Sequence, residues 1–302
     1  MSRKIAIVIC LLSATLSTLA QSYQPYTIGT TSDLPINKIK PTLERRLTEN
    51  GFKVCGSYTP SHNKNSAVIA VTSDEIIDSV TKVGGLSGFS AGFRVALTTN
   101  PTTKKTTVSY MTPNYWGLAY FRDDFEKVKD KYKKLNQKFN KVFSVYPDFK
   151  AIGFGSKKGL SKDDLTGYQY MWGMPEFDDT DELNSFKDYK SAINKIDSNL
   201  AEGVKNLQLV YSIEIPGQNL KVYGIALNGP DGESSFVPTI DFGIHKHTAF
   251  LPYEILVKDN EVHMLHGKFR IALSFPDLSM GSFMKIVSTP GDIEDLLKTA
   301  TE

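Results

Sequence analysis

The stretch from residue 251 to residue 286 places the strongest constraint on the fold. It contains an apolar run over 253–257, then a polar turn, and then alternating apolar and polar side chains over 261–275. Alternation with a period of two is typical of a strand with one buried face. The stretch therefore predicts a long β-hairpin that has a bulge at Gly267 and ends at a turn beginning with Pro276.

The second strand of this hairpin would have one apolar face and one polar face. The polar face would carry His266, Lys268 and Arg270. Three hydrogen-bond donors spaced by two residues could bind a carboxylate or a phosphate, because a guanidinium offers two parallel N–H groups to such an anion. An ordinary solvated sheet face would have the same spacing. These three residues are therefore one candidate ligand-binding site.

The first twenty residues have the pattern of a secretory signal peptide. Arg3 and Lys4 precede an apolar run over 5–12, and small residues up to Ala20 offer a cleavage site. The run is too short to cross a bilayer, and no later stretch reaches the roughly 20 apolar residues that a span requires. We expect cleavage near Ala20 and a periplasmic or secreted protein without a transmembrane segment.

Export would change the charge balance and the cysteine count. The whole chain has 35 Lys and Arg against 33 Asp and Glu, and cleavage would remove two basic residues and no acidic one. A nearly neutral protein is a poor candidate for nucleic-acid binding. Cys55 would remain as a single cysteine, expected to be a small buried residue, so no internal disulfide could form. We expect the partner to be a small molecule or another protein.

The order of predicted elements occurs twice. Residues 21–122 and 182–302 each contain an amphipathic helix, strand pairs and a closing hairpin, and residues 123–181 connect them. The connecting segment begins with a helix over 123–143 that has one apolar stripe and a lysine-rich remainder. The sequence predicts an α+β protein of two related units, each an antiparallel sheet with packed helices, joined by a long helix and loop insert.

Two local stretches support an internal duplication. Residues 93–121 and 253–286 both run strand, turn, strand, proline, Asn or Asp, and then a large apolar residue. This comparison aligns Pro113 with Pro276, an offset of about 163 residues.

The first repeat resembles a known family. A helix, the residues Glu49-Asn50-Gly51-Phe52, a strand pair, a short helix, the hairpin from Phe93 and then Thr112-Pro113 follow the order of the small bacterial and archaeal domain-of-unknown-function family numbered 302, which sometimes occurs in tandem. The closing hairpin of the second repeat is similar to that of the same domain, so the resemblance covers about two thirds of the chain beyond residue 20.

The chain departs from this family in two places. Thr72-Ser73 stands where the family has Asn-Pro after its second strand, and the insert over 123–181 has no counterpart. The resemblance implies an α+β fold with an antiparallel sheet. It carries no established activity.

Four of the five histidines fall within a short stretch, at His245, His247, His263 and His266. The first two would share a face of an extended segment, and the other two would lie on a neighbouring strand. Imidazoles suit Zn²⁺ or copper, and nearby methionines would suit Cu(I) or a haem iron. Strict alternation would instead send His263 and His266 to opposite faces, which leaves isolated surface histidines as the alternative.

The end of the insert, residues 165–181, is rich in aromatic residues and methionine. Its side chains, with Tyr170 and Trp172 as candidates for ligand contact, could line a pocket or fill the junction between the two repeats. The acidic residues that follow predict the N-terminus of a helix ahead of Leu183.

Gly88-Phe89-Ser90-Ala91-Gly92 fits the Gly-x-Ser-x-Gly pattern of a nucleophilic serine. That pattern works where a strand precedes the serine and a helix follows it. Here a glycine-rich loop precedes Ser90 and a predicted strand over 93–98 follows, so a plain flexible turn is the alternative.

The sequence favours an exported, non-catalytic binding or accessory protein that holds an unknown ligand in the cleft between the two repeats. One alternative is a metal- or haem-binding protein that uses the four histidines. The other is a hydrolase with Ser90 as its nucleophile.

Overall fold

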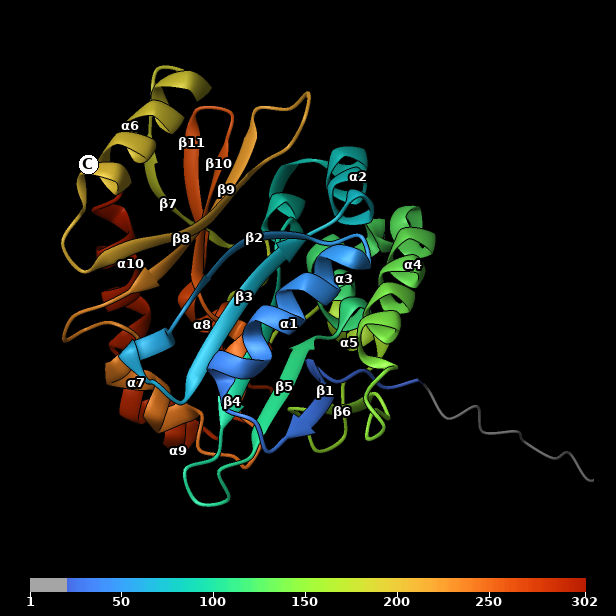
Figure 1. Cartoon of the computed structure of the whole chain (residues 1–302). Helices are drawn as coiled ribbons and strands as arrows, with labels where there is room; N and C mark the ends of the chain where they lie inside the picture. Colours follow the sequence, from blue (N-terminus) through green and yellow to red (C-terminus); the bar gives the residue numbers. More distant parts are fainter. Residues whose placement is uncertain (1–20) are drawn as a thin grey trace, which may run out of the picture.

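The computed structural model describes residues 21–302. This part of the chain forms two antiparallel sheets with helices packed on them (Figure 1). The predicted signal peptide, residues 1–20, lies outside the described residues. Within 21–302, no helix combines the length and the apolar composition needed to cross a membrane.

The first unit contains five strands and four helices in the order β-α-β-β-α-β-β-α-α. They are β1 (Tyr26–Ser32), α1 (Ile36–Glu49), β2 (Lys53–Tyr58), β3 (Ser66–Thr72), α2 (Asp74–Val83), β4 (Phe93–Thr99), β5 (Thr106–Met111), α3 (Pro113–Phe121) and α4 (Phe125–Phe143). The insert then adds β6 (Ile152–Phe154) and α5 (Lys162–Thr166).

The second unit repeats this order. Its elements are β7 (Thr180–Ser185), α6 (Tyr189–Glu202), β8 (Leu207–Glu214), β9 (Leu220–Leu227), α7 (Glu233–Ile240), β10 (Tyr253–Lys258), β11 (Glu261–Leu265), α8 (Gly267–Ser274), α9 (Met280–Phe283) and α10 (Thr289–Lys298). The strand order is β2-β3-β4-β5-β1-β6 in the first sheet and, read from β8, β8-β9-β10-β11-β7 in the second. The predicted α+β fold of two related units is therefore confirmed.

The two sheets also match in detail. A bulge interrupts β2 between Val54 and Gly56, and another interrupts β8 between Leu209 and Tyr211. A bulge adds one unpaired residue to a strand, so it marks a register position. Alignment of the two bulges relates each residue of β2 to the residue 155 positions later in β8, as Gly56 and Tyr211 show.

The same register relates Arg94 to Glu254. Arg94 on β4 is opposite Ala70, the partner of Gly56, and Glu254 on β10 is opposite Gly224, the partner of Tyr211. These two residues of opposite charge therefore occupy equivalent positions in the two units.

The predicted second strand of the closing hairpin is too long. β11 ends at Leu265, and α8 begins at Gly267, where we expected a bulge. The His266 Nδ1 atom accepts a hydrogen bond from the Lys268 backbone N–H (3.1 Å), so His266 caps the helix and ends the strand. The alignment of Pro113 with Pro276 is consequently wrong, because Pro113 opens α3 and Gly267 opens the equivalent helix α8.

A strand that the sequence pattern did not predict, β1, pairs with both β5 and β6. One further expectation fails. The acidic residues around 178–182 precede and enter the strand β7 instead of a helix.

The helix of the insert is confirmed over Phe125–Phe143, with the stripe of apolar side chains buried. It packs on the first sheet, where Phe139 lies 4.5 Å, ring centre to ring centre, from Tyr110 of β5.

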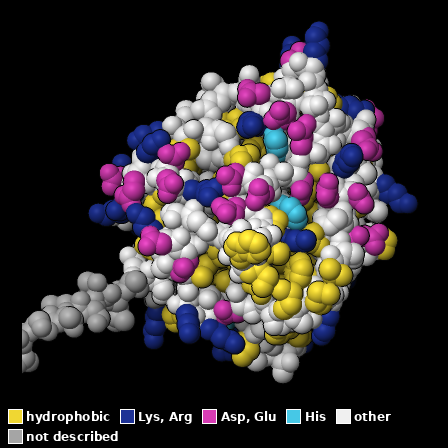
Figure 2. Space-filling view, turned by 180° about the vertical axis from the view of Figure 1, so that it is seen from behind, with side chains coloured by type: hydrophobic (Ala, Val, Ile, Leu, Met, Phe, Trp, Pro, Cys, Tyr) yellow, Lys and Arg dark blue, Asp and Glu magenta, His cyan; other side chains and the backbone are white. Residues whose placement is uncertain are grey.

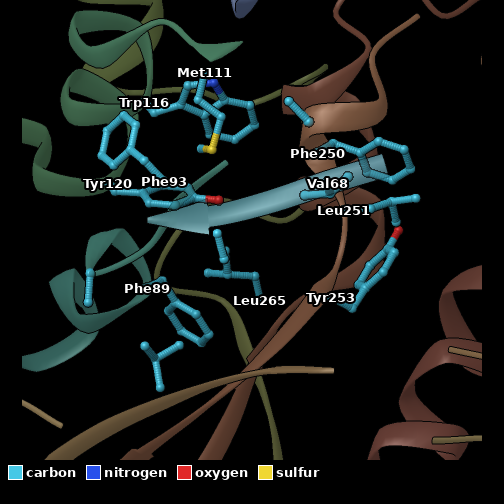
Figure 3. Packing of buried hydrophobic residues seen from close by; sticks show 14 of the residues in the cluster. Val68, Phe89, Phe93, Met111, Trp116, Tyr120, Phe250, Leu251, Tyr253 and Leu265 are labelled. Carbon is cyan, nitrogen blue, oxygen red and sulfur yellow. The ribbon is translucent and has the colours of Figure 1, made fainter. Parts of the chain in front are cut away.

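The two units exchange short segments where they meet. The 3₁₀ segment Gly85–Ser90, which precedes β4, packs on β9 and β10 of the second sheet. The equivalent segment Thr248–Phe250, which precedes β10, packs on β3, β4 and β5 of the first sheet. Figure 3 shows this packing, in which Phe89 and Phe250 lie among buried residues of the other unit. One continuous apolar core therefore joins the two units.

Candidate binding cleft between the two units

A cavity of about 890 Å³ opens between the edge strands of the two sheets. We call it the inter-unit cleft. One wall is the start of β2 with the N-terminus of α2, and the other wall is the end of β8 with the turn after it. The lining residues are Gly51, Phe52, Lys53, Val54, Cys55, Thr72, Ser73, Asp74, Ile77, Asp78, Ser212, Ile213, Glu214 and Pro216.

The two edge strands come closest at their bulges. A Cβ atom added to Gly56 would lie 1.9 Å from the carbonyl oxygen of Val210, a distance that only glycine avoids. The approach of β2 to β8 at this point divides the space between the two strands into two sides. Because the strands are equivalent, corresponding residues of β2 and β8 lie on opposite sides. Gly51–Cys55 and Ser212–Glu214 form the open side, while Tyr58 and Ser61 lie on the other.

The other side of the contact is closed by a buried carboxyl group. Glu233, the first residue of α7, is fully buried and accepts hydrogen bonds from the Tyr58 hydroxyl (2.9 Å), the Ser61 N–H (2.9 Å) and the Leu227 N–H (3.3 Å). Burial outweighs these three donors and raises the pKa of Glu233 to about 7. We call these contacts the Glu233 latch.

The open side lacks the equivalent of this latch. The register of the bulges makes Ile213 of β8 the equivalent of Tyr58 of β2, and Ile213 has no hydroxyl group. Three residues beyond, Pro216 stands where Ser61 supplies an N–H, and proline has none. The first residue of α2 is Asp74, which is exposed in the cleft. The inter-unit cleft is therefore equivalent to the side that the Glu233 latch closes, but it lacks the contacts that close that side.

The cleft is acidic and contains one unsatisfied hydroxyl group. Asp74, Asp78 and Glu214 line it with a single lysine, Lys53, and Asp78 is already paired with Lys131 (2.5 Å). Thr72 is 5% exposed, and its hydroxyl has no hydrogen-bond partner within 21–302. A ligand with positive charge and hydrogen-bonding groups would complement this lining.

A buried charge cluster lies between the units. Glu254 is held between Arg94 Nη1 (2.7 Å) and Arg270 Nη1 (2.9 Å), and it also accepts a hydrogen bond from the Tyr211 hydroxyl. All three charged side chains are 2% exposed or less. Other N–H groups of the two arginines donate to backbone carbonyls, including those of Phe250 and Pro252. Arg94 Nη2 and Arg270 Nε have no hydrogen-bond partner within residues 21–302. This cluster links Arg94 of the first unit to Glu254 and Arg270 of the second.

The predicted basic strand face does not exist. Because Gly267–Ser274 is a helix, Arg270 points into the buried charge cluster, while His266 caps the helix and Lys268 is half-buried. The three donors have three different surroundings, so they form no common anion site. Sequence spacing could not reveal this, because Arg270 pairs with Glu254, and the same carboxylate also binds Arg94 of the first unit.

The four histidines have separate structural contacts. His247 Nδ1 donates to the Ser274 carbonyl (2.9 Å), His263 contacts Thr180 (3.2 Å) and Glu261 (3.0 Å), and His245 is exposed beside Phe154. Within residues 21–302, no three His, Cys, Asp or Glu side chains converge as a metal site requires. His245 and His247 do lie near the same ring of Phe154.

The aromatic segment of the insert fills the junction and also reaches solvent. Phe177 lies between Tyr120 of α3 (5.3 Å) and Phe269 of α8 (6.0 Å), and the Tyr170 hydroxyl donates to the Leu278 carbonyl (2.8 Å). Trp172, in contrast, is 95% exposed. Neither Tyr170 nor Trp172 lines the inter-unit cleft.

Ser90 lies in the 3₁₀ segment that packs between the units. It is 3% exposed, and its hydroxyl donates to the Ser87 carbonyl (2.7 Å). A nucleophile needs access to its substrate and a base that receives its proton. Here the hydroxyl proton is engaged by a backbone carbonyl, so the arrangement is that of a structural serine.

Cys55 is the bulged residue of β2 and is only partly buried at the cleft, where we expected a fully buried side chain. Partial burial raises the pKa of its thiol. The thiol is therefore protonated at neutral pH.

Comparisons with known proteins give little more. No protein-family model matches the chain, and no curated protein matches it. One solved structure with some likeness is the crystal structure of an uncharacterized conserved protein DUF302 from Bacillus stearothermophilus, with 13% sequence identity and a TM-score of 0.34. The likeness covers 39% of this chain and 95% of that chain. It is a partial likeness to an uncharacterised protein and names no activity.

Proposed function

We propose that this chain is a non-catalytic binding protein that holds an extended, basic peptide segment in the inter-unit cleft. The observation that carries the proposal is the position of the cleft, between two strands that each form the edge of a sheet. An edge strand offers backbone N–H and C=O groups that have no partner in its own sheet. An extended peptide can pair with such groups by adding a strand.

The second unit supports this choice of ligand. The Glu233 latch closes the equivalent groove with groups of the chain itself, whereas the cleft has lost the hydroxyl of Tyr58 and the N–H of Ser61 at the corresponding positions. The side with the Glu233 latch is filled by residues of the chain itself, whereas the equivalent cleft is open and has space for a separate peptide. The carboxylates of Asp74 and Glu214, which form no ion pair within residues 21–302, favour lysine or arginine in that peptide.

Two further parts of the proposal rest on the sequence. We propose that the protein is exported, on the pattern of residues 1–20. We also propose that the two units are tandem copies of the family numbered 302. The shared element order and the matching bulges support the duplication.

The proposal is tested with a labelled, capped peptide of alternating lysine and valine, whose binding is followed by fluorescence anisotropy. We expect saturable binding, and we expect Ser212→Trp to weaken it at least tenfold, because Ser212 is exposed and lines the cleft. Gln208→Trp is the matched control, since Gln208 is an exposed residue of the same strand that does not line the cleft. Binding that is equally strong in both variants would contradict the proposal.

A second comparison tests how the peptide is held. Strand addition uses backbone N–H groups, so methylation of alternate peptide nitrogens should abolish binding. A glutamate–valine peptide should bind at least tenfold more weakly than the lysine–valine peptide, because Asp74 and Glu214 would repel it.

A further inference from the structure

A second cavity, of about 500 Å³, lies elsewhere between the two units. We call it the aromatic pocket. The first half of the chain contributes β6 and the loop after it, Gly153–Lys157. The second contributes the end of α7 with its following loop, Ile240–Gly243, together with His247 and the segment around Phe275. The volume is in the range of small-molecule sites, and the pocket shares no lining residue with the inter-unit cleft.

The walls of the aromatic pocket are flat rings. The imidazole of His247 stacks on Phe275 at 4.5 Å with an angle of 13° between the planes, and Phe154 lies 5.9 Å from the same imidazole. Phe242 also lines the pocket, although its side chain is 71% exposed to solvent. Figure 2 shows that apolar side chains gather beside histidines on this rear view of the molecule. Such walls favour an aromatic or apolar ligand body.

The buried polar groups of the pocket accept hydrogen bonds. Because His247 Nδ1 donates to the Ser274 carbonyl, Nε2 of the neutral ring is an acceptor, and burial lowers the pKa of His247 to about 4. Asp241 is 6% exposed, and both of its carboxylate oxygens accept from the His247 backbone N–H (3.1 and 3.0 Å).

The Asp241 carboxylate has no ion-pair partner within the described part of the chain. Lys246 binds the backbone carbonyl of Asp241 and not its carboxylate. Lys157 and Asp277 also line the pocket, and Asp277 accepts from the Lys157 N–H. Burial raises the pKa of Asp241 to about 6, although the His247 N–H and the nearby Lys246 ammonium act in the opposite direction. A buried carboxylate of this kind is stabilised by a cation that carries hydrogen-bond donors.

We propose that the aromatic pocket binds a small molecule that has a protonated amine on an aromatic or apolar body. The ammonium group donates to the Asp241 carboxylate and to Nε2 of His247, and the body lies against Phe242, Phe154 and Phe275. This site is separate from the inter-unit cleft, so it adds a second ligand class to the peptide of the proposed function.

Two probes with the same fluorophore test this inference, namely dansylcadaverine, which carries an ammonium group, and dansylglycine, which carries a carboxylate. At pH 7.5 we expect a saturable, blue-shifted increase in the fluorescence of dansylcadaverine, and at least tenfold weaker binding of dansylglycine. Asp241→Asn keeps an acceptor for the His247 N–H and removes the charge, so it should weaken dansylcadaverine binding about tenfold or more. Equal affinity for the two probes would overturn the inference.

A pair of surface variants tests the location even if Asp241→Asn does not fold. Phe242→Ser removes an exposed wall of the pocket and should weaken dansylcadaverine binding at least fivefold. Ile244→Ser changes a more exposed apolar residue of the same loop (87%) that does not line the pocket, and it should leave binding unchanged. An unaltered affinity in Phe242→Ser would refute the inference. Ser212→Trp should still bind dansylcadaverine, which separates this site from the cleft.

Discussion

Glu254→Gln will lower the free energy of unfolding by about 3 to 5 kcal/mol, the cost typical of removing one partner from a buried ion pair. Glu254 is 1% exposed and is the carboxylate shared by Arg94 and Arg270. Its replacement by a neutral amide leaves two buried guanidinium groups without a counter-charge. Because Arg94 comes from the first unit and the other two residues come from the second, the variant should loosen the joint between the units.

Urea unfolding at pH 7, followed by circular dichroism, measures this effect. Glu49→Gln is the matched control, because Glu49 forms an ion pair with Arg45 (2.8 Å) in which both side chains are more than half exposed. Exposed pairs of this kind contribute about 0 to 1 kcal/mol. A loss below about 1 kcal/mol in Glu254→Gln would show that the cluster is not a major tie between the units.

Glu233 should make the wild-type protein less stable as the pH rises from 5 to 8. Its pKa is about 7 in the folded protein, against an ordinary value of 4.5, so the folded state retains a proton that the unfolded chain has released. The stabilisation is complete below about pH 4.5 and is lost as the pH rises through 7. Each pKa unit corresponds to about 1.4 kcal/mol, so Glu233 alone should lower the free energy of unfolding by about 2.5 kcal/mol between pH 5 and pH 8.

Two other buried groups titrate nearby with opposite signs. Asp241, whose pKa rises from 3.8 to about 6, loses its stabilisation as the pH rises through 6. His247, whose pKa falls from 6.5 to about 4, instead gains stability as the pH rises through the same range. The two contributions largely offset each other, which leaves Glu233 as the main source of the slope.

Unfolding in urea at pH 5, 6, 7 and 8 tests the sign and the size of this slope. Glu233→Gln cannot ionise, so its stability should be nearly independent of pH over this range, and Glu49→Gln should keep the wild-type slope. If wild type and Glu233→Gln show parallel curves, another group controls the pH dependence.

The repeated strand pairs could be predicted because one apolar face leaves a period of two in the sequence. α8 could not be recognised in this way. Phe269, Ile271 and Leu273 alternate as in a strand, but Arg270 and Ala272 between them and Ser274 after them are also buried, so the helix has no polar face to show its period. From the sequence, an arginine is expected to be exposed, because nothing in its own segment shows a buried carboxylate such as Glu254 that would pair with it.

The sequence predicts a cleft between the two repeats, but it does not identify any of the residues that line the inter-unit cleft as ligand contacts. Its walls come from strands that are far apart in the chain, and the contact between them depends on two bulges that leave no periodic signal. Gly56 was the one available clue, because a glycine inside a strand often marks a close approach of another backbone. The aromatic pocket was missed because its loops have no regular pattern, although His247 had been singled out as a metal ligand.

The Glu233 latch shows what a single chain with two related halves can do that a pair of identical subunits cannot. In a symmetric dimer, one substitution changes both copies of a groove at once, so a mutation that seals one copy seals the other. Here the halves are encoded separately, and the residues at equivalent positions differ, with Tyr58 and Ser61 in one half and Ile213 and Pro216 in the other. Substitutions can therefore close one groove as a contact between the units without changing the equivalent groove, in which other substitutions can improve ligand binding.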